Sequence, residues 1–316
     1  MRIVFVGTGE FGVPAMEALR AAGHEIIAAV SQPDRPAGRG RQLQPTPIRT
    51  AAERLGIPHT QAQDINVFAP REIAPTAELG LVVAFGQKIG PAWLNAFFHG
   101  CINIHGSLLP RYRGAAPYQW AVINGDAETG VTVFRLNERW DAGPILGMAR
   151  TPIGDTETAD ELHDRLARLG AELIPDVVHR IETGTATPLP QDAAVATRAP
   201  KLTRADSAID WSQPAGKLVR RINGLWSWPT AVCTLPLAGS APLRVQLARA
   251  ALVDAGDSAS NEAPAGTLAP DGTVQCGKGR LQLLEIKPAG GKCVHFADFA
   301  NGRRLNSPMQ LGPAES

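Results

Sequence analysis

The chain holds little cysteine, with four residues among 316. None of the four belongs to a C-x-x-C pair, so the sequence indicates neither a zinc site nor a disulfide framework. The histidines show no metal-ligand spacing either. We therefore predict no metal, and we regard the cysteines as reduced side chains without chemistry: Cys101, Cys233, Cys276 and Cys293.

Long hydrophobic runs are missing as well. No stretch of about 18 apolar residues occurs, which excludes a predicted membrane-spanning helix. The amino terminus, MRIVFVGTGEFG, lacks the basic start, apolar stretch and cleavage site of a signal peptide. We therefore expect a cytoplasmic protein without a membrane partner.

A strong excess of one charge is also missing, because the net charge is only +1. The two parts of the chain differ, however. Residues 1–197 carry 17 Lys and Arg against 21 Asp and Glu, and residues 198–316 carry 14 against 9. The basic carboxy-terminal part suggests a polyanionic partner, although a surplus of this size is also common on solvated surfaces.

Alternating strand and helix patterns occupy the first 190 or so residues. Thr46 and Pro47 are typical of a helix start, and Thr158 with Glu161 forms a capping-box pattern. Buried strands are predicted at Ile3–Val6, Glu25–Ser31, Leu81–Phe85, Cys101–His105 and Val131–Leu136. This alternation predicts an α/β domain with a doubly wound, mostly parallel, Rossmann-like sheet.

A different organisation follows. Residues 188–205 are rich in Thr, Ala and Pro without a helical period, and we interpret them as a linker between domains 1–187 and 206–316. Short strands separated by turn residues then predict a small β-barrel. A length of 316 residues agrees with two domains.

A glycine motif, Gly7-x-Gly9-x-x-Gly12, follows the first strand. Such a motif can bind a dinucleotide when an acidic residue ends the second strand. Here that strand ends in Ser31-Gln32-Pro33, and Asp34 comes later. We interpret the glycines as a tight strand-to-helix turn and predict no NAD.

Polar residues gather after one buried strand. Asn103 and His105 lie two apart, so their side chains share a face at the carboxyl end of a parallel strand, where α/β sheets bind ligands. A loop rich in Pro and Gly follows, and Asp141 precedes another glycine turn. A lone Asn-x-His pair often only completes hydrogen bonds at a strand end, but the three pieces in this order indicate a site.

These segments resemble a known family. NIHGSLLPRYRGAAP followed by WDAGPIL is similar to the motifs of folate-dependent formyltransferases. The loop QPDRPAGRGRQLQPTP and the stretches KLTRADSAIDWS, NGLWSWP and LLEIKPAGGK resemble the branch that acts on methionyl initiator tRNA. The resemblance covers nearly the whole chain, in the same order.

The resemblance implies a fold, a reaction and a set of residues. It implies an OB-like barrel as the second domain, 10-formyltetrahydrofolate as co-substrate, a monomer, and methionyl initiator tRNA as acceptor. The catalytic positions fall on Asn103, His105 and Asp141. The folate-contacting positions fall on Ser107, Leu108, Leu109, Pro110, Phe85 and Gly86.

The chemistry suits these residue types. The attacking α-amine has a pKa near 8, so no covalent nucleophile is needed. We expect Asn103 and His105 to donate hydrogen bonds to the oxyanion, and Asp141 to orient His105 and accept the proton through water. Sequence leaves open whether His105 or Asp141 carries that proton.

Arginines supply the candidate tRNA contacts. The loop between the second strand and the next helix contains Arg35, Arg39 and Arg41, and Arg39 is the best candidate for acceptor-stem recognition. Arg220 and Arg221 on a helix of the second domain would hold the tRNA body. Trp226 and Trp228 could stack on nucleic acid or pack inside the protein.

Three other functions compete with this one. A formyltransferase for a sugar-nucleotide amine would share the three catalytic residues but gives no reason for the basic loop and barrel. An NAD-dependent oxidoreductase lacks its acidic residue. An RNA-binding protein without catalysis has no need of Asn103, His105 and Asp141.

Overall fold

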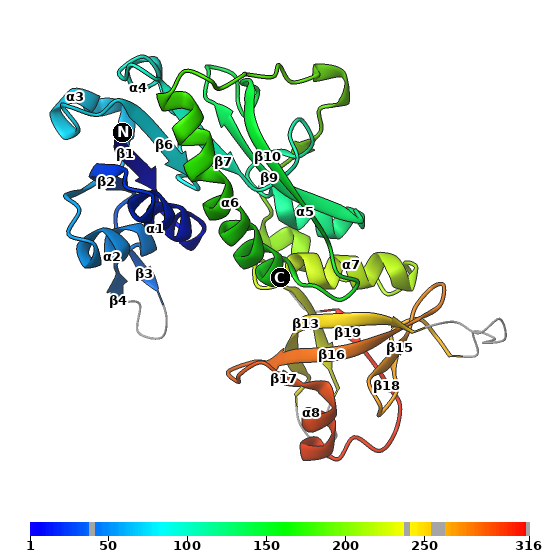
Figure 1. The fold of residues 1–316 in the computed structure, drawn as a ribbon. Helices are drawn as coiled ribbons and strands as arrows, with labels where there is room; N and C mark the ends of the chain where they lie inside the picture. The colour runs from blue at the N-terminus through cyan, green and yellow to red at the C-terminus, as the bar shows by residue number, and fades with distance from the viewer. Residues whose placement is uncertain (38–41, 237–240, 254–262, 314–316) are drawn as a thin grey trace. The chain divides into compact units, whose positions relative to one another are not determined.

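The computed structural model describes residues 1–37, 42–236, 241–253 and 263–313. The chain forms two compact units (Figure 1). Unit 1 comprises Met1–Pro117, Thr129–Thr151 and His163–Pro200. Unit 2 comprises Tyr118–Glu128, Pro152–Leu162 and Lys201–Ser316.

A seven-stranded sheet with the order β10-β9-β7-β6-β1-β2-β5 forms the centre of unit 1. The strands from β7 to β5 pair in parallel, whereas β9 pairs with β7 in antiparallel. This confirms the predicted mostly parallel sheet. The strands are β1 (Arg2–Gly7), β2 (Glu25–Ser31), β5 (His59–Gln61), β6 (Leu79–Val83), β7 (Cys101–His105), β9 (Glu128–Arg135) and β10 (Ile145–Pro152).

Helices separate these strands along the chain. The predicted cap is present, because Thr46 Oγ1 accepts from Arg49 N at 3.2 Å. The predicted capping box is present too, with Thr158 N donating to Glu161 Oε2 at 3.0 Å. The helices are α1 (Val13–Ala21), α2 (Pro47–Arg54), α3 (Pro70–Ile73), α4 (Pro91–Leu94), α5 (Pro117–Asn124) and α6 (Ala159–Glu182).

The core of unit 1 explains the first glycine of the early motif. Strands β1, β2 and β6 bury Val4, Val6, Val30 and Val82. A Cβ on Gly7 would lie 2.7 Å from the carbonyl oxygen of the neighbouring strand. The glycine is therefore required for close packing, in agreement with the structural interpretation of the motif.

Two short pairings in unit 1 were not predicted. The basic loop contains a hairpin of β3 (Arg35–Ala37) and β4 (Gln42–Gln44). Within the segment interpreted as a linker, β11 (Arg198–Ala199) pairs in parallel with β8 (Arg113–Gly114). The chain after α6 thus returns to the loop that follows β7.

Unit 2 is built on a sheet of eight strands. Seven of them follow the order β18-β14-β15-β16-β13-β12-β19, and the eighth, β17, pairs with β16. Its pairings are antiparallel, and the sheet forms the near-closed barrel that was predicted. Unit 2 includes α5 after Pro117, together with the helices α7 (Ala215–Leu225) and α8 (Phe296–Arg303). Its strands are β12 (Ala231–Leu235), β13 (Leu243–Val253), β14 (Thr267–Leu268), β15 (Thr273–Gln275), β16 (Arg280–Pro288), β17 (Val294–His295), β18 (Met309–Gln310) and β19 (Gly312–Pro313).

Candidate active site

A small cavity lies at the carboxyl end of the central strands of unit 1. Asn103 of β7 lines it beside Asp141, together with apolar walls from Val82, Ile89 and Leu136. The cavity holds about 50 Å³, which is room for one or two water-sized groups. The remaining lining residues are Gln87, Lys88, Asn137, Glu138, Arg139 and Trp140.

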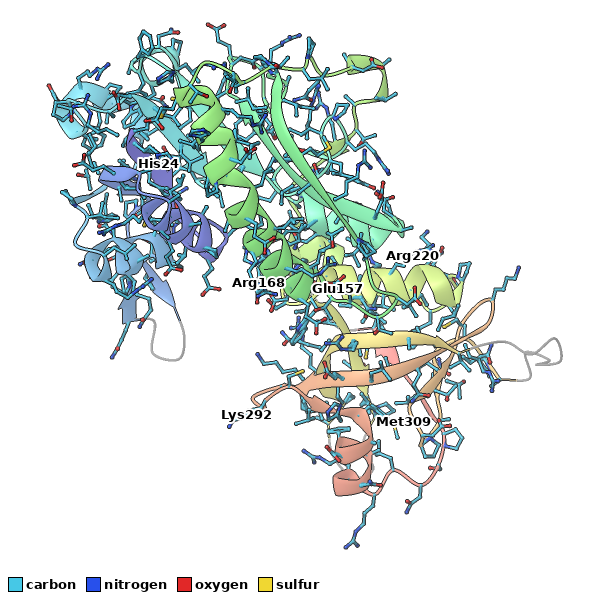
Figure 2. The ribbon with its side chains drawn as sticks, in the orientation of Figure 1. His24, Glu157, Arg168, Arg220, Lys292 and Met309 are labelled. Atoms are coloured by element: carbon cyan, nitrogen blue, oxygen red, sulfur yellow. The ribbon has the colours of Figure 1, made fainter. Side chains whose placement is uncertain are left out.

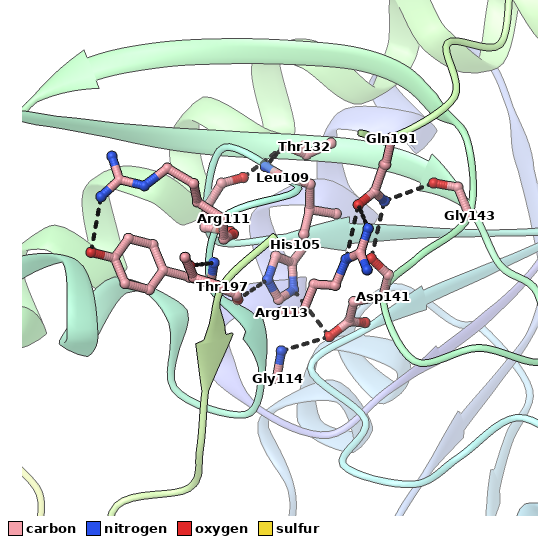
Figure 3. Close-up of polar contacts among 12 residues, drawn as sticks. His105, Leu109, Arg111, Arg113, Gly114, Thr132, Asp141, Gly143, Gln191 and Thr197 are labelled. Carbon is pink, nitrogen blue, oxygen red and sulfur yellow. Dashed lines mark hydrogen bonds and ion pairs between the residues drawn. The ribbon is translucent and has the colours of Figure 1, made fainter. Parts of the chain in front are cut away.

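His105 stands at the last position of β7 and is 7 % exposed. Its Nε2 lies 2.9 Å from the backbone carbonyl oxygen of Tyr112. A carbonyl only accepts, so Nε2 carries the hydrogen and the neutral ring keeps a free lone pair on Nδ1. That Nδ1 faces Asp141 Oδ2 at 4.0 Å, beyond hydrogen-bonding distance (Figure 3).

Asp141 is a buried carboxylate in a left-handed backbone conformation, with φ of 48°. Its Oδ2 accepts a hydrogen bond from the backbone N–H of Gly114 at 2.8 Å. A non-glycine residue in this conformation is strained unless its surroundings hold it. The Gly114 contact fixes the carboxylate oxygen that faces His105.

Gln191 holds the turn that carries Asp141. Its Nε2 donates to the carbonyl oxygens of Asp141 at 3.0 Å and Gly143 at 2.7 Å. Its Oε1 accepts from Arg113 Nε at 3.0 Å and from the Arg113 guanidinium at 2.7 Å. One amide thus ties the Asp141 turn to the β8 segment (Figure 3).

The Tyr112 segment, whose carbonyl oxygen binds His105, is itself held in place by Thr197. The backbone N–H of Tyr112 donates to Thr197 Oγ1 at 2.8 Å. A Cβ on Gly114 would lie only 2.4 Å from the carbonyl oxygen of Ala199, so glycine permits the close approach of β8 and β11. Both strands of this pair therefore support the site.

Sequence reasoning missed Gln191 and Thr197. Both lie in the segment of residues 188–205 that was interpreted as a linker. The only signal was a polar side chain, Gln191, in a run of Thr, Ala and Pro. Neither residue lies close in sequence to the groups that it binds, so local patterns could not identify them.

The predicted folate-contacting residues lie around the site but do not line this cavity. Ser107 is fully buried and donates to the carbonyl oxygen of Arg111 at 2.7 Å. The backbone N–H of Leu109 donates to Thr132 Oγ1 at 3.1 Å. Leu108 and Pro110 are partly exposed; Phe85 is buried, and Gly86 is exposed with φ of 78°.

The predicted tRNA-binding arginines have different surroundings. Arg35 donates to Gln32 Oε1 at 2.6 Å, while Arg39 and Arg41 lie outside the described residues. Arg221 donates to the backbone carbonyl oxygens of Asp206 and Ala208, so part of its hydrogen-bonding capacity is used within unit 2. Arg220 is exposed (Figure 2).

The structure also gives findings on metals, membranes and thiols. In the part of the chain that is described, no group of three or more His, Cys, Asp or Glu side chains could hold a metal ion. Among the described helices, none combines the length and the apolar character that crossing a membrane requires. Burial raises the pKa of the Cys101 and Cys233 thiols to about 12, so both stay protonated at neutral pH.

Comparison with known proteins gives a consistent result. A family model described as formyl transferase matches residues 1–178, and its carboxy-terminal counterpart matches residues 201–304. A methionyl-tRNA formyltransferase of Halorhodospira halophila is 44 % identical over 98 % of this chain and 99 % of its own. One of Heliobacterium modesticaldum is 41 % identical over 99 % of this chain and 100 % of its own.

Solved structures support the fold. HypX from Aquifex aeolicus in complex with tetrahydrofolic acid matches with a TM-score of 0.63 at 17 % identity, covering 95 % of this chain and 46 % of that one. An N-formyltransferase from Helicobacter canadensis matches with a TM-score of 0.63 at 14 % identity, covering 88 % and 97 %. The chain therefore belongs to the formyl transferase family, within the group of the methionyl-tRNA formyltransferases.

Proposed function

We propose that the protein transfers a formyl group from 10-formyltetrahydrofolate to the α-amino group of methionyl initiator tRNA. One observation carries the proposal: Asn103 and Asp141 line one cavity and His105 Nδ1 faces Asp141 Oδ2 at 4.0 Å, in a chain 44 % identical over nearly its full length to a protein named methionyl-tRNA formyltransferase. The sugar-nucleotide alternative has support from structures of 14–19 % identity, which show the fold alone.

The reaction begins with attack by the methionyl nitrogen on the formyl carbon. The neutral amine supplies the electron pair, and negative charge develops on the formyl oxygen. Asn103 lines the cavity, and its side-chain amide donates to that oxygen. Loss of one such donor typically costs about a hundredfold or more in rate.

The proton must then move from the amine to the leaving folate nitrogen. In His105 the Nε2 hydrogen is engaged by Tyr112, so Nδ1 is the nitrogen that accepts the amine proton. The Asp141 carboxylate, 4.0 Å away, stabilises the imidazolium by Coulomb attraction. The imidazolium gives the proton to the folate nitrogen as the tetrahedral intermediate collapses, which restores His105.

The residues around the cavity suit a folate. Apolar walls beside Asn103 and Asp141 resemble the apolar sites with a few polar groups that small ligands use. A cavity of about 50 Å³ accommodates the formyl group but not a whole pterin. Side chains at its mouth, such as the half-exposed Trp140, must therefore move when folate binds. We assign contacts with the rest of the folate to Phe85, Gly86 and residues 107–110.

On the tRNA side, we assign the acceptor end to the basic loop with Arg35, Arg39 and Arg41. We assign the tRNA body to unit 2, where Arg220 is exposed and Arg221 keeps part of its guanidinium bound to backbone oxygens. We further propose a cytoplasmic monomer, with a catalytic domain of residues 1–187, a linker of residues 188–205 that supplies Gln191 and Thr197 to the catalytic site, and a tRNA-binding domain of residues 206–316.

The decisive experiment measures formyl-methionine after incubation with 10-formyltetrahydrofolate and methionyl initiator tRNA. Elongator methionyl-tRNA serves as the substrate control, and an Asn103→Ala protein serves as the enzyme control. We expect formylation of the initiator alone, with loss of activity in the variant. Formylation of an amino-sugar nucleotide instead of the tRNA would contradict the proposal.

A further inference from the structure

A cavity of about 520 Å³ lies entirely within unit 2. Its walls come from the segment around η4 (Arg204–Ser207), the turn after α7 and the strands β12, β13 and β16. No Asp or Glu is among the lining residues that the structure describes. The lining includes cationic, polar and aromatic side chains that suit an anionic ligand: Arg204, Trp228, Thr230, Arg244, Gln246 and Lys287.

The strand register explains why two cations meet here. Gln246 of β13 lies opposite Lys287 of β16 in the antiparallel ladder. Arg244 is two residues before Gln246, so all three side chains project from one face of the sheet. Val245, between them, is fully buried on the other face. The pairing therefore places Arg244 and Lys287 on neighbouring positions of the same outer face.

In the part of the chain that the structure describes, these cations lack a neutralising partner. Among the described residues, no carboxylate lies within ion-pair distance of Arg204, Arg244 or Lys287. By contrast, Arg249 on the same strand β13 pairs with Glu161 at 2.6 Å and with Glu285 at 3.2 Å. Unpaired cations around a concave surface concentrate a positive potential, which attracts anions.

An aromatic side chain and a buried hydroxyl complete the cavity. Trp228 is 52 % exposed, and the Arg204 guanidinium lies 5.9 Å from its ring centroid. Thr230 is 4 % exposed and has φ of 69°, and its Oγ1 has no hydrogen-bond partner among the residues described. A β-branched residue in this conformation is strained, and such strain concentrates at ligand sites.

We propose that this cavity binds a phosphodiester group of an RNA backbone, with Arg204, Arg244 and Lys287 around the phosphate and Trp228 stacked on the adjoining nucleotide. The inference rests on the proposed function, because initiator tRNA supplies the RNA. Guanidinium groups hold phosphate oxygens through charge-assisted hydrogen bonds. An exposed indole offers a stacking surface that accepts any base. A free nucleotide has the same chemistry, so the experiment includes it.

The test measures the dissociation constant of unacylated initiator tRNA from about 50 to 200 mM salt, the range over which phosphate contacts change affinity most visibly. The variants are Arg244→Ala with Lys287→Ala, and Trp228→Leu. Arg303→Ala, an exposed arginine on α8, is the control for charge loss outside the cavity. AMP and inorganic phosphate are titrated separately, with tryptophan fluorescence as the signal.

We expect the double variant to bind tRNA about tenfold to a hundredfold more weakly, the loss of one or two charged hydrogen bonds. The slope of log K against log salt should fall by about 1, because both cations lie around the same phosphate. Trp228→Leu should weaken binding without changing that slope. The kcat at saturating tRNA and the KM for 10-formyltetrahydrofolate should stay at wild-type values in all variants.

Unchanged affinity and slope in the double variant would overturn the proposal, as would an equal loss in Arg303→Ala. Micromolar binding of AMP that the double variant abolishes, with tRNA binding unchanged, would assign the cavity to a free nucleotide and also overturn it. The two proposals fail separately. Wild-type protein that binds tRNA through these residues but formylates nothing contradicts only the function, and normal formylation with unaffected binding contradicts only the cavity.

Discussion

The candidate active site and the cavity of unit 2 differ in how many of their polar side chains are bound by other parts of the protein. Around Asp141, the described contacts link Gly114, Gln191 and Arg113 into one network. Around Arg244 and Lys287, the cations have no carboxylate partner among the described residues. The difference teaches that a reaction requires groups with fixed positions, whereas electrostatic binding requires charges that the protein has not already neutralised.

The strongest test of the fixed site replaces Asp141 with Asn. Asn tolerates the left-handed backbone and can still accept from Gly114, so the geometry is kept while the charge is lost. Because the imidazolium of His105 then lacks its carboxylate, we expect kcat to fall by roughly a thousandfold or more. Single-turnover formylation measures the effect, with tRNA affinity as the control. A loss below tenfold would show that His105 acts without Asp141.

The next test loosens the site without touching its reacting groups. Gln191→Met keeps the side-chain length but removes the donors to Asp141 and Gly143 and the acceptor for Arg113. A displaced carboxylate should lower kcat by up to about a hundredfold while the KM for tRNA stays constant. Gln191→Glu keeps the acceptor for Arg113 but not the donors to Asp141 and Gly143, so activity retained in this variant would show that acceptance from Arg113 positions the turn.

A third test separates binding from chemistry by salt. If the cations of unit 2 neutralise one phosphate, raising salt from about 50 to about 200 mM should increase the KM for tRNA about threefold through this contact alone. The kcat should change little, because the buried site is screened less than the surface. Steady-state kinetics at several salt concentrations provide both values. A parallel fall in kcat would show that salt affects the chemical step as much as tRNA binding, which would contradict the separation of the two functions between the two regions.

The smallest expected effect concerns a histidine outside both regions. Burial, with Arg49 nearby, holds the pKa of His59 below its usual value of 6.5, and its Nε2 lies 3.0 Å from Ser31 Oγ. The unfolded chain therefore binds a proton at higher pH than the folded chain. The contribution of neutral His59 to the free energy of unfolding is fully present above pH 6.5 and is lost as the pH falls toward the pKa of His59 in the folded protein.

Thermal unfolding at pH 7.5 and 5.0 measures this dependence, and His59→Gln should reduce it. Burial also lowers the pKa of His24, so His24 destabilises the protein at low pH in the same direction. It should account for part of the pH dependence that remains in His59→Gln. An unchanged pH dependence in His59→Gln would show that the lowered pKa has no consequence for stability.

Sequence predicted local features of the fold well. Asn103 and His105 end strand β7 as expected, since a run of buried β-formers determines a strand locally. The caps at Thr46 and Thr158 were confirmed for the same reason: each depends on residues within one helical turn. The barrel of unit 2 also agrees with the prediction from short strands and turns.

Features that depend on distant residues were not predicted. Gln191 looked like part of a linker, because its partners Asp141 and Arg113 are 50 and 78 residues away. The juxtaposition of Arg244 with Lys287 depends on the register of β13 against β16, which a charge count does not reveal. For the same reason, the role of Nδ1 in His105 follows only once Tyr112 is seen to bind Nε2.

The pairing of β11 with β8 has a consequence for the synthesis of the protein. Thr197, which fixes the Tyr112 segment, emerges from the ribosome 85 residues after that segment. At about 5–20 residues per second, the interval is roughly 4–17 s. During that time the nascent chain contains Asn103, His105 and then Asp141, but it lacks Thr197 throughout and Gln191 until shortly before Thr197. The enzyme thus gains its catalytic geometry late in translation, after every one of its proposed catalytic groups has been made.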